Sequence, residues 1–213
     1  KLNQLLNIDT PEFYLSYLDT DCLKERIEHV NSIINHEDDL VSLAGFSMVE
    51  GVILYSAFAY IKHHQSQGKN KLLNIVRGIN FSVRDENLHS LAGAWSFKHK
   101  LKQSNLTAEQ KSALHTKILD LANTLYEHEK EIIKLTFAKG KIEGITETQI
   151  LHFVESRINE CLKELGIPKM FDVKYNPVAE WFYKGINDYQ FNDFFSAIGR
   201  EYNRNWSEEE FTW

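Results

Sequence analysis

The sequence predicts an all-α protein, and three observations support that prediction. The 213 residues include only three prolines and ten glycines, so few positions interrupt a helix. Long stretches repeat apolar residues at helical spacing, for example Ile27, Val30, Ile33 and Ile34. No internal repeat or low-complexity linker divides the chain. Because 43% of the residues are hydrophobic and 25% are charged, the chain can bury a substantial core, and one domain is expected.

The individual helices follow from the apolar period and from the residues that begin and end it. Thr10 and Thr107 each precede an acidic residue in what would be a first turn, and Gly166 is typical of a helix end. On this basis helices are expected at about residues 11–18, 20–35, 39–66, 68–100, 107–138, 146–165 and 177–185.

The C-terminal residues differ in character from the rest of the chain. From about residue 191 the sequence is first rich in aromatic residues and then acidic, and it loses a convincing amphipathic period. We therefore expect a helical domain over residues 1–190 and a tail over residues 191–213.

Charge and cysteine content narrow the class of function. A net charge of −6 with interspersed acids and bases leaves no basic patch for nucleic acid, so small molecules or proteins are the expected partners. Cys22 and Cys161 lie far apart and outside any CxxC spacing, which indicates neither a disulfide framework nor a zinc site. The sequence begins at Lys1 with no secretory signal peptide, and a reducing cytoplasm is the expected compartment.

The most informative segment runs from Leu40 to Ile61, where Glu50 is the only charged residue. A helix that is apolar on all sides must be buried. A membrane span is one reading, but a central glutamate and scattered serines and glycines favour a core helix instead. A carboxylate buried there needs a cation, a hydrogen-bonding partner or a metal, the alternative being a neutral glutamic acid in the core.

A second motif, Glu86-x-x-His89, is the only Glu-x-x-His pair in the chain. Residues three apart lie on the same side of a helix, so both side chains can bind metal from one direction. Alone the motif is equally typical of a solvated helix face, but apolar residues surround it at helical spacing. Together with Glu50 it forms half of the ligand pattern of ferritin-like dinuclear carboxylate proteins, and residues 1–49 contain no other half.

Two other groups of ionisable residues are expected at the surface. His63 and His64 would end the Glu50 helix and face solvent near its C-terminus. A charged cluster alternates with lysines as on a solvated face, and it comprises Glu127, His128, Glu129 and Glu131. The sequence contains no glycine-rich phosphate loop and no Ser-His-Asp signature.

VEGVILYSAFAYI, followed by VRDENLH, resembles the second half of the small, radical-generating subunit of class I ribonucleotide reductases. YNPVAEWF and NDFFSAIGREY extend the resemblance toward the C-terminus, so that it covers nearly the whole chain. It implies a ferritin-like helical bundle that is incomplete here. The family's first carboxylate, its first Glu-x-x-His and its radical-bearing tyrosine would precede Lys1, so either a second polypeptide supplies them or the sequence is a fragment.

The resemblance also implies roles for particular residues near the motifs. Glu50, Glu86 and His89 would be metal ligands, and Asp85 would hydrogen-bond a ligand histidine from the missing half.

Three further residues would serve the radical. Leu54 and Phe58 would line an apolar pocket around it, although simple core packing is an equally compatible role for both. Tyr202 would relay the radical, and residues 203–213 would dock on the large subunit.

The implied function is to supply half of a dinuclear metal centre whose oxidising equivalent passes to the large subunit for reduction of ribonucleotides. Iron is the favoured metal, with manganese or a mixed pair as alternatives. The implied partners are the large subunit, an N-terminal small-subunit segment and a second copy of the assembled small subunit. Three other readings remain: a dinuclear oxygenase or desaturase, an iron-storage protein, and a scaffold without metal.

Overall fold

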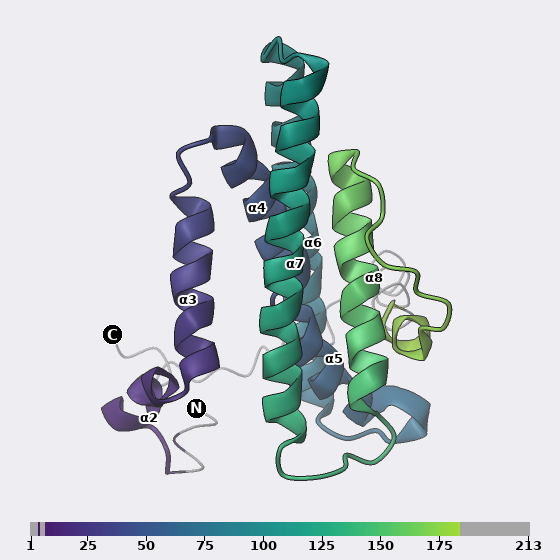
Figure 1. Ribbon diagram of the computed structural model, residues 1–213. Coiled ribbons are helices and arrows are strands. Elements are labelled where there is room, and N and C mark those ends of the chain that lie inside the picture. The colour runs from purple at the N-terminus through teal and green to yellow at the C-terminus, as the bar shows by residue number, and fades with distance from the viewer. Residues whose placement is uncertain (1–3, 5–6, 184–213) are drawn as a thin grey trace, which may run out of the picture.

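The computed structural model describes residue 4 and residues 7–183, and the regular structure of these residues is helical apart from one isolated β-bridge. The all-α prediction is confirmed. Figure 1 shows α7 in front of α4 and α6, with α3 on one side and α8 on the other. The elements are α2 (Pro11–Leu15), η1 (Ser16–Asp19), α3 (Asp21–Ile34), α4 (Asp39–Val52), α5 (Tyr55–Lys62), η2 (His63–Gly68), α6 (Leu73–Gln103), α7 (Ala108–Phe137) and α8 (Glu147–Leu165), with a further helical stretch at residues 177–183.

Capping residues account for most helix ends. Thr10 is the N-cap of α2, and its side chain accepts a hydrogen bond from a backbone amide one turn later. Thr107 and Thr146 begin α7 and α8 with reciprocal capping boxes, which satisfy two otherwise unpaired amides at each start. Gly166 ends α8 in the left-handed conformation at φ 78°, as its sequence position predicts.

The stretch predicted as one helix over residues 39–66 is divided. α4 ends at Val52 and α5 begins at Tyr55, with two turn residues between them, and the last four residues, 63–66, belong to the 3-10 helix η2. The following helix begins at Leu73 rather than at residue 68. Gly68 and Leu72 both have positive φ, a conformation that an α-helix does not accommodate.

The α4 helix is the centre of the core. It packs against α3, α6, α7 and α8, and Ala44, Met48 and Val52 are fully buried. The helical region Asp39–Ser66 is long and apolar enough to cross a membrane by length and composition alone. Its burial among four helices is that of a core helix, as its central glutamate and small polar residues indicate.

Glu129, expected at the surface, is instead fully buried. It lies one turn after Leu125 and one turn before Ile133 on the buried face of α7. Arg26 of α3 donates a hydrogen bond to the Oε1 atom of Glu129 and forms an ion pair with it. Burial raises the pKa of the Glu129 carboxyl to about 7, although the positive charge of Arg26 opposes the shift. The pair therefore links α3 to α7 while holding a charge in the interior.

Of the other residues expected at the surface, some are exposed and one is buried. Glu127 and Glu131 are exposed, and each pairs with a lysine one turn away on α7. The expectation for His63 is wrong, because this residue is buried. The chain tightens into η2 directly after α5, which brings the His63 ring onto the carbonyl of Tyr60 and against the ring of His64.

The variant Glu129→Gln should change how stability depends on pH. The carboxyl pKa is raised from 4.5 to about 7, so its stabilising contribution is complete below pH 4.5 and is lost as the pH rises through 7. Between about pH 5 and about pH 8 we expect wild type to lose roughly 1–3 kcal/mol of unfolding free energy relative to the variant.

Urea denaturation of both proteins at the two pH values would measure this difference. Burial, and then His128, lower the pKa of His29, which gives an opposite slope in both proteins and cancels in the comparison. Glu131→Gln, an exposed site on the same helix, is the matched control and should follow wild type. Equal slopes for wild type and Glu129→Gln would contradict the prediction.

Candidate metal centre

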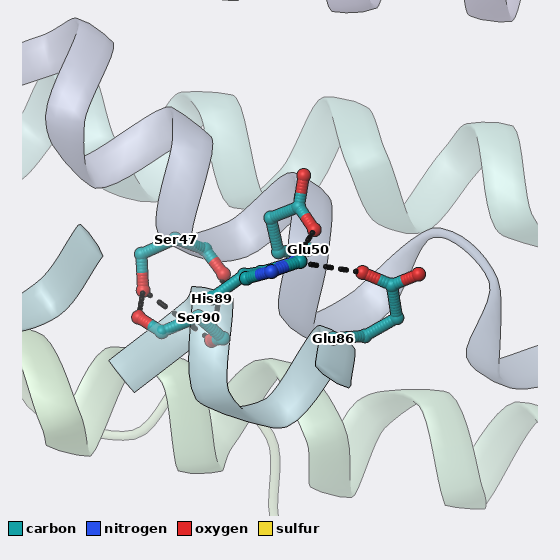
Figure 2. A network of polar contacts seen from close by, with 5 residues as sticks. All are labelled: Ser47, Glu50, Glu86, His89 and Ser90. Carbon is teal, nitrogen blue, oxygen red and sulfur yellow. Dashed lines mark hydrogen bonds and ion pairs between the residues drawn. The ribbon is translucent and has the colours of Figure 1, made fainter. Parts of the chain in front are cut away.

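Three predicted ligands from two helices converge at one place. Glu50 lies in the last turn of α4, and Glu86 and His89 lie one turn apart in the middle of α6. The His89 Nδ1 atom is 3.2 Å from Glu50 Oε2 and 3.3 Å from Glu86 Oε2 (Figure 2). One ligand atom from each residue lies within 4.8 Å of the others, so a single ion could contact all three.

The charges in this group compensate one another. Burial raises the pKa of Glu50, and the neighbouring Glu86 adds to the shift while His89 opposes it. Hydrogen bonds that the His89 ring donates to Glu50 and then to Glu86 raise the pKa of His89, because two carboxylates favour the imidazolium form. A proton on His89 therefore offsets part of the negative charge. A divalent cation would take over that role, displacing the proton as it binds the ring nitrogen.

Two serines hold α4 and α6 in the register that brings the ligands together. The Ser47 hydroxyl donates to the carbonyl of Ser90 at 2.7 Å, and the Ser90 hydroxyl donates to the carbonyl of Ser47 at 2.8 Å. Ser47 precedes Glu50 by one turn and Ser90 directly follows His89, as Figure 2 shows. Both serines are buried. Sliding one helix along the other would break both bonds, so this serine pair defines the helix register at the ligands.

Two glycines allow the helices to approach this closely. A Cβ atom on Gly51 would lie 2.3 Å from Cys161 Sγ and 2.6 Å from Ser90 Oγ. A Cβ atom on Gly93 would lie 3.1 Å from the backbone Cα of Ser47. Any larger residue at either position would push α4 away from α6, and the Gly51 contact lies directly beside ligand Glu50.

One side of α6 is apolar and exposed next to the ligands. Phe81, Leu88 and Trp95 are seven residues apart and so lie on one face of the helix, and Leu88 and Trp95 are each 64% exposed. His89 lies between this face and the buried face of the same helix, and Glu86 lies on the buried side. A row of large exposed apolar residues usually marks a surface that another element covers. We call these three residues the apolar stripe.

The other residues that the resemblance singles out have different environments. Asp85 is exposed beside Glu86 on α6. Leu54 is 42% exposed in the break after α4, whereas Phe58 is buried with its ring 5.9 Å from that of Tyr55. Phe58 thus has the core packing that was its alternative role. Tyr202 lies outside the described residues, and the roles suggested for all four remain predictions.

Residues 2–177 match the protein family described as ribonucleotide reductase, small chain. The chain belongs to this family. A probable ribonucleoside-diphosphate reductase small subunit, 048L, of Invertebrate iridescent virus 3 is 26% identical over 172 residues. Ribonucleotide reductase small subunits work with a large subunit, usually form dimers and use a dinuclear metal centre.

Solved structures agree with the ferritin-like fold that the resemblance implies. A putative class I ribonucleotide reductase from Bacillus halodurans has a TM-score of 0.71 at 22% identity, over 81% of this chain. A ribonucleotide reductase R2 subunit from Clostridium botulinum has a TM-score of 0.65 at 18% identity, over 84% of this chain. The matches span only 43% of the viral protein and 62% and 58% of the two solved chains.

Sequence reasoning missed several residues that organise the contact between α4 and α6. Ser47 and Ser90 are ordinary small polar residues in sequence, and only the packing of two helices pairs them. Burial of Arg157 could have been predicted from the sequence, because Arg157 shares a helix face with the apolar residues Val154 and Cys161, both of which are buried. A lone arginine on an apolar face needs buried partners.

Removing the paired serines should weaken the α4–α6 contact. We expect Ser47→Ala and Ser90→Ala each to lower the unfolding free energy by about 1 kcal/mol, and the double variant to lose less than the sum. Denaturant titrations of the four proteins in a double-mutant cycle would measure the coupling. Ser96→Ala, on α6 but outside the pair, is the control. Strict additivity would show that the two serines act independently.

Proposed function

We propose that this chain supplies one half of a dinuclear metal centre in a ribonucleotide reductase small subunit, with Glu50, Glu86 and His89 as its ligands. The observation that carries the proposal is the convergence of two carboxylates and an imidazole from two packed helices, with ligand atoms within 4.8 Å, in a chain of this family. An iron-storage protein or an oxygenase would share the ligands, but the family match favours the reductase.

The donor set fits the proposed metals. Carboxylate oxygens with one imidazole suit iron or manganese, whereas cysteine ligands would favour zinc or an iron–sulfur cluster. Iron is the metal we favour, with manganese or a mixed pair as alternatives. Three ligands cannot complete the coordination of two ions, so the remaining donors must come from elsewhere.

The missing half would come from the N-terminal segment of the small subunit, whether it belongs to the same polypeptide or to another. In ferritin-like dinuclear proteins two further helices contribute a carboxylate and a second Glu-x-x-His. The apolar stripe supports such a contact, since Phe81, Leu88 and Trp95 offer an uncovered helix face beside the ligands. Covering this face would exclude water from both the stripe and the metal site.

The residues around the ligands would orient and protect the centre. When bound, the metal pair supplies one-electron oxidising power, as it does in the family. Asp85 would accept a hydrogen bond from a ligand histidine of the N-terminal segment and so hold its tautomer. Leu54, now exposed, would be covered with the stripe and would exclude water together with Phe58.

Transfer to the large subunit would depend on the C-terminal part of the chain. Tyr202 would give up its phenolic proton and one electron to the small-subunit centre and recover both from the large subunit. Residues 203–213 would dock there, with Phe211 and Trp213 as apolar anchors. Ribonucleotide reduction itself would occur on the large subunit, in the cytoplasm, with the assembled small subunit as a dimer.

Replacing the ligands should abolish metal loading without unfolding the chain. In the chain purified together with its small-subunit partner segment, we expect Glu86→Ala and His89→Ala to lose most bound iron or manganese while helical content stays near wild type. Metal analysis and circular dichroism of the same samples would test this. Glu131→Ala, an exposed glutamate on α7, is the control.

Two results would overturn these assignments. Full metal loading of both variants would remove Glu86 and His89 from the coordination sphere. A wild-type complex without metal after loading with Fe²⁺ and with Mn²⁺ would favour the scaffold reading instead.

The variant Tyr202→Phe should separate cofactor assembly from turnover. Phenylalanine keeps the ring but has no phenolic proton to lose, so the relay would stop. We expect normal metal loading and normal binding to the large subunit, with nucleotide reduction reduced by at least two orders of magnitude. Metal analysis, a binding titration and a turnover assay on one preparation would test all three parts. Near-normal turnover would take Tyr202 off the route, and loss of binding would make it an anchor.

A further inference from the structure

The break between α4 and α5 begins at Ile53, three residues after Glu50, and it leaves a backbone carbonyl to be satisfied. In a continuous helix the amide of Tyr55 would donate to the carbonyl of Gly51. Here helical bonding stops at Ile53, whose amide donates to Val49, and no backbone amide of the described residues donates to the Gly51 oxygen. Gly51 is fully enclosed by neighbouring helices. An unpaired carbonyl in such a place would destabilise the fold, because it loses its hydrogen bond to water and gains none in return.

A side chain from α8 takes the place of the missing amide. The Nε atom of Arg157 donates to the Gly51 carbonyl at 3.0 Å, and the guanidinium carbon lies 4.1 Å from the centre of the Tyr55 ring. The same planar group therefore contacts the last turn of α4 and the first residue of α5. Arg157 is 6% exposed, so both interactions occur away from solvent, where they are strongest.

The far end of the guanidinium is held by the C-terminal segment. The Nη1 atom of Arg157 donates to the hydroxyl of Tyr183 at 2.9 Å. Tyr183 is the last described residue of the helical stretch at residues 177–183, and its ring packs against those of Phe153 and Phe182. No carboxylate pairs with Arg157 among the ion pairs of the described residues. Its position thus depends on Gly51, Tyr55 and Tyr183.

We infer that Arg157 is a positioning residue for Glu50, and that Tyr183 sets the place of Arg157. The α4–α5 break would keep its geometry only while the guanidinium bridges it, and that geometry directs the Glu50 carboxylate toward Glu86 and His89. The contact makes the ligand site dependent on the segment that leads toward the C-terminus. The metal-binding part of this inference rests on the proposed function above.

A lysine cannot replace this arginine. Its ammonium group is a compact donor without the planar fork, so it cannot reach Gly51 and Tyr183 together or stack on Tyr55 in the same way. Tyr183→Phe is the milder change, because it keeps the ring packing and removes only the hydroxyl that accepts from Arg157. The two variants therefore probe the bridge from its centre and from its C-terminal end.

Hydrogen–deuterium exchange gives a readout that needs no metal. In the full chain we expect Arg157→Lys to speed exchange of amides in residues 50–58 at least tenfold, and Tyr183→Phe to speed it several-fold, with α7 peptides unchanged. Tyr126→Phe is the matched control, since Tyr126 donates at 3.0 Å to Glu155, which lies two residues from Arg157 but on the opposite face of α8. Should Arg157→Lys unfold the chain, Tyr183→Phe alone decides.

Binding of Mn²⁺ gives the second readout, followed by electron paramagnetic resonance in the complex with the partner segment. We expect about a tenfold weaker affinity in Arg157→Lys and a smaller loss in Tyr183→Phe, the range typical for residues that orient ligands. Exchange at residues 50–58 equal to wild type in both variants would overturn the inference. So would faster exchange with unchanged Mn²⁺ affinity, because Arg157 would then stabilise the break without positioning Glu50.

The ligand assignment and the role of Arg157 can be tested independently. If wild type and Glu86→Ala bind Mn²⁺ equally weakly, the ligand assignment is wrong, while the exchange data still decide whether Arg157 and Tyr183 maintain the break. If wild type binds Mn²⁺ and Glu86→Ala does not, the ligand assignment stands and the Arg157 variants are judged on both readouts.

Discussion

The close approach of α4 and α6 is the constraint on which the rest of the structure depends. Ligand atoms from the two helices can lie within 4.8 Å only if the backbones nearly touch. Gly51 and Gly93 remove the side chains that would separate them, and the reciprocal bonds between Ser47 and Ser90 define the register. Because interiors are close-packed, the flanking helices must then conform to this pair. The aromatic and aliphatic core of α7 and α8 fills the space on one side only.

The two sides of the α4–α6 pair are therefore unequal. Toward α7 and α8 the helices are buried, with Met48, Val52 and Phe97 fully enclosed. On the other side lie the two carboxylates and the imidazole (Figure 2), and the exposed apolar stripe is on the same helix as Glu86 and His89. Exposure of the apolar stripe to water is unfavourable, so burial of the stripe would be stabilising. Burial of the carboxylates is unfavourable unless a cation lies beside them. Under the proposed function, coverage by helices that bring further ligands and enclose a metal would satisfy both demands.

The helices could be predicted from the regular spacing of apolar residues, and the candidate ligands from charged residues in apolar surroundings. Glu50 could be identified because it is the only charged residue from Leu40 to Ile61. Glu86 and His89 could be identified because their spacing places both on one side of a helix. The structure brings these three side chains together. The break after Val52 was not predictable, since Ile53 and Leu54 are ordinary apolar residues and no proline lies there. Burial of Glu129 was missed because charged neighbours hid its place on the inner face of α7.

Two buried basic side chains, Lys62 and Arg157, join the segment that carries Phe182 and Tyr183 to the helical core. These contacts fix the position of that segment. Lys62 donates to Asn80 at 2.6 Å and to the carbonyl of Phe182 at 2.9 Å, and burial lowers its pKa to about 7. Arg157 donates to Gly51 and to Tyr183. Each basic side chain donates to a backbone carbonyl and to a polar side chain. These hydrogen bonds offset the free energy that is lost when a charged group is removed from water. Consecutive residues of one segment therefore complete two buried sites, and displacing that segment would expose both cations at once. The helices α4 and α5 are for this reason joined to the segment that carries Phe182 and Tyr183, although 133 residues separate Glu50 from Tyr183.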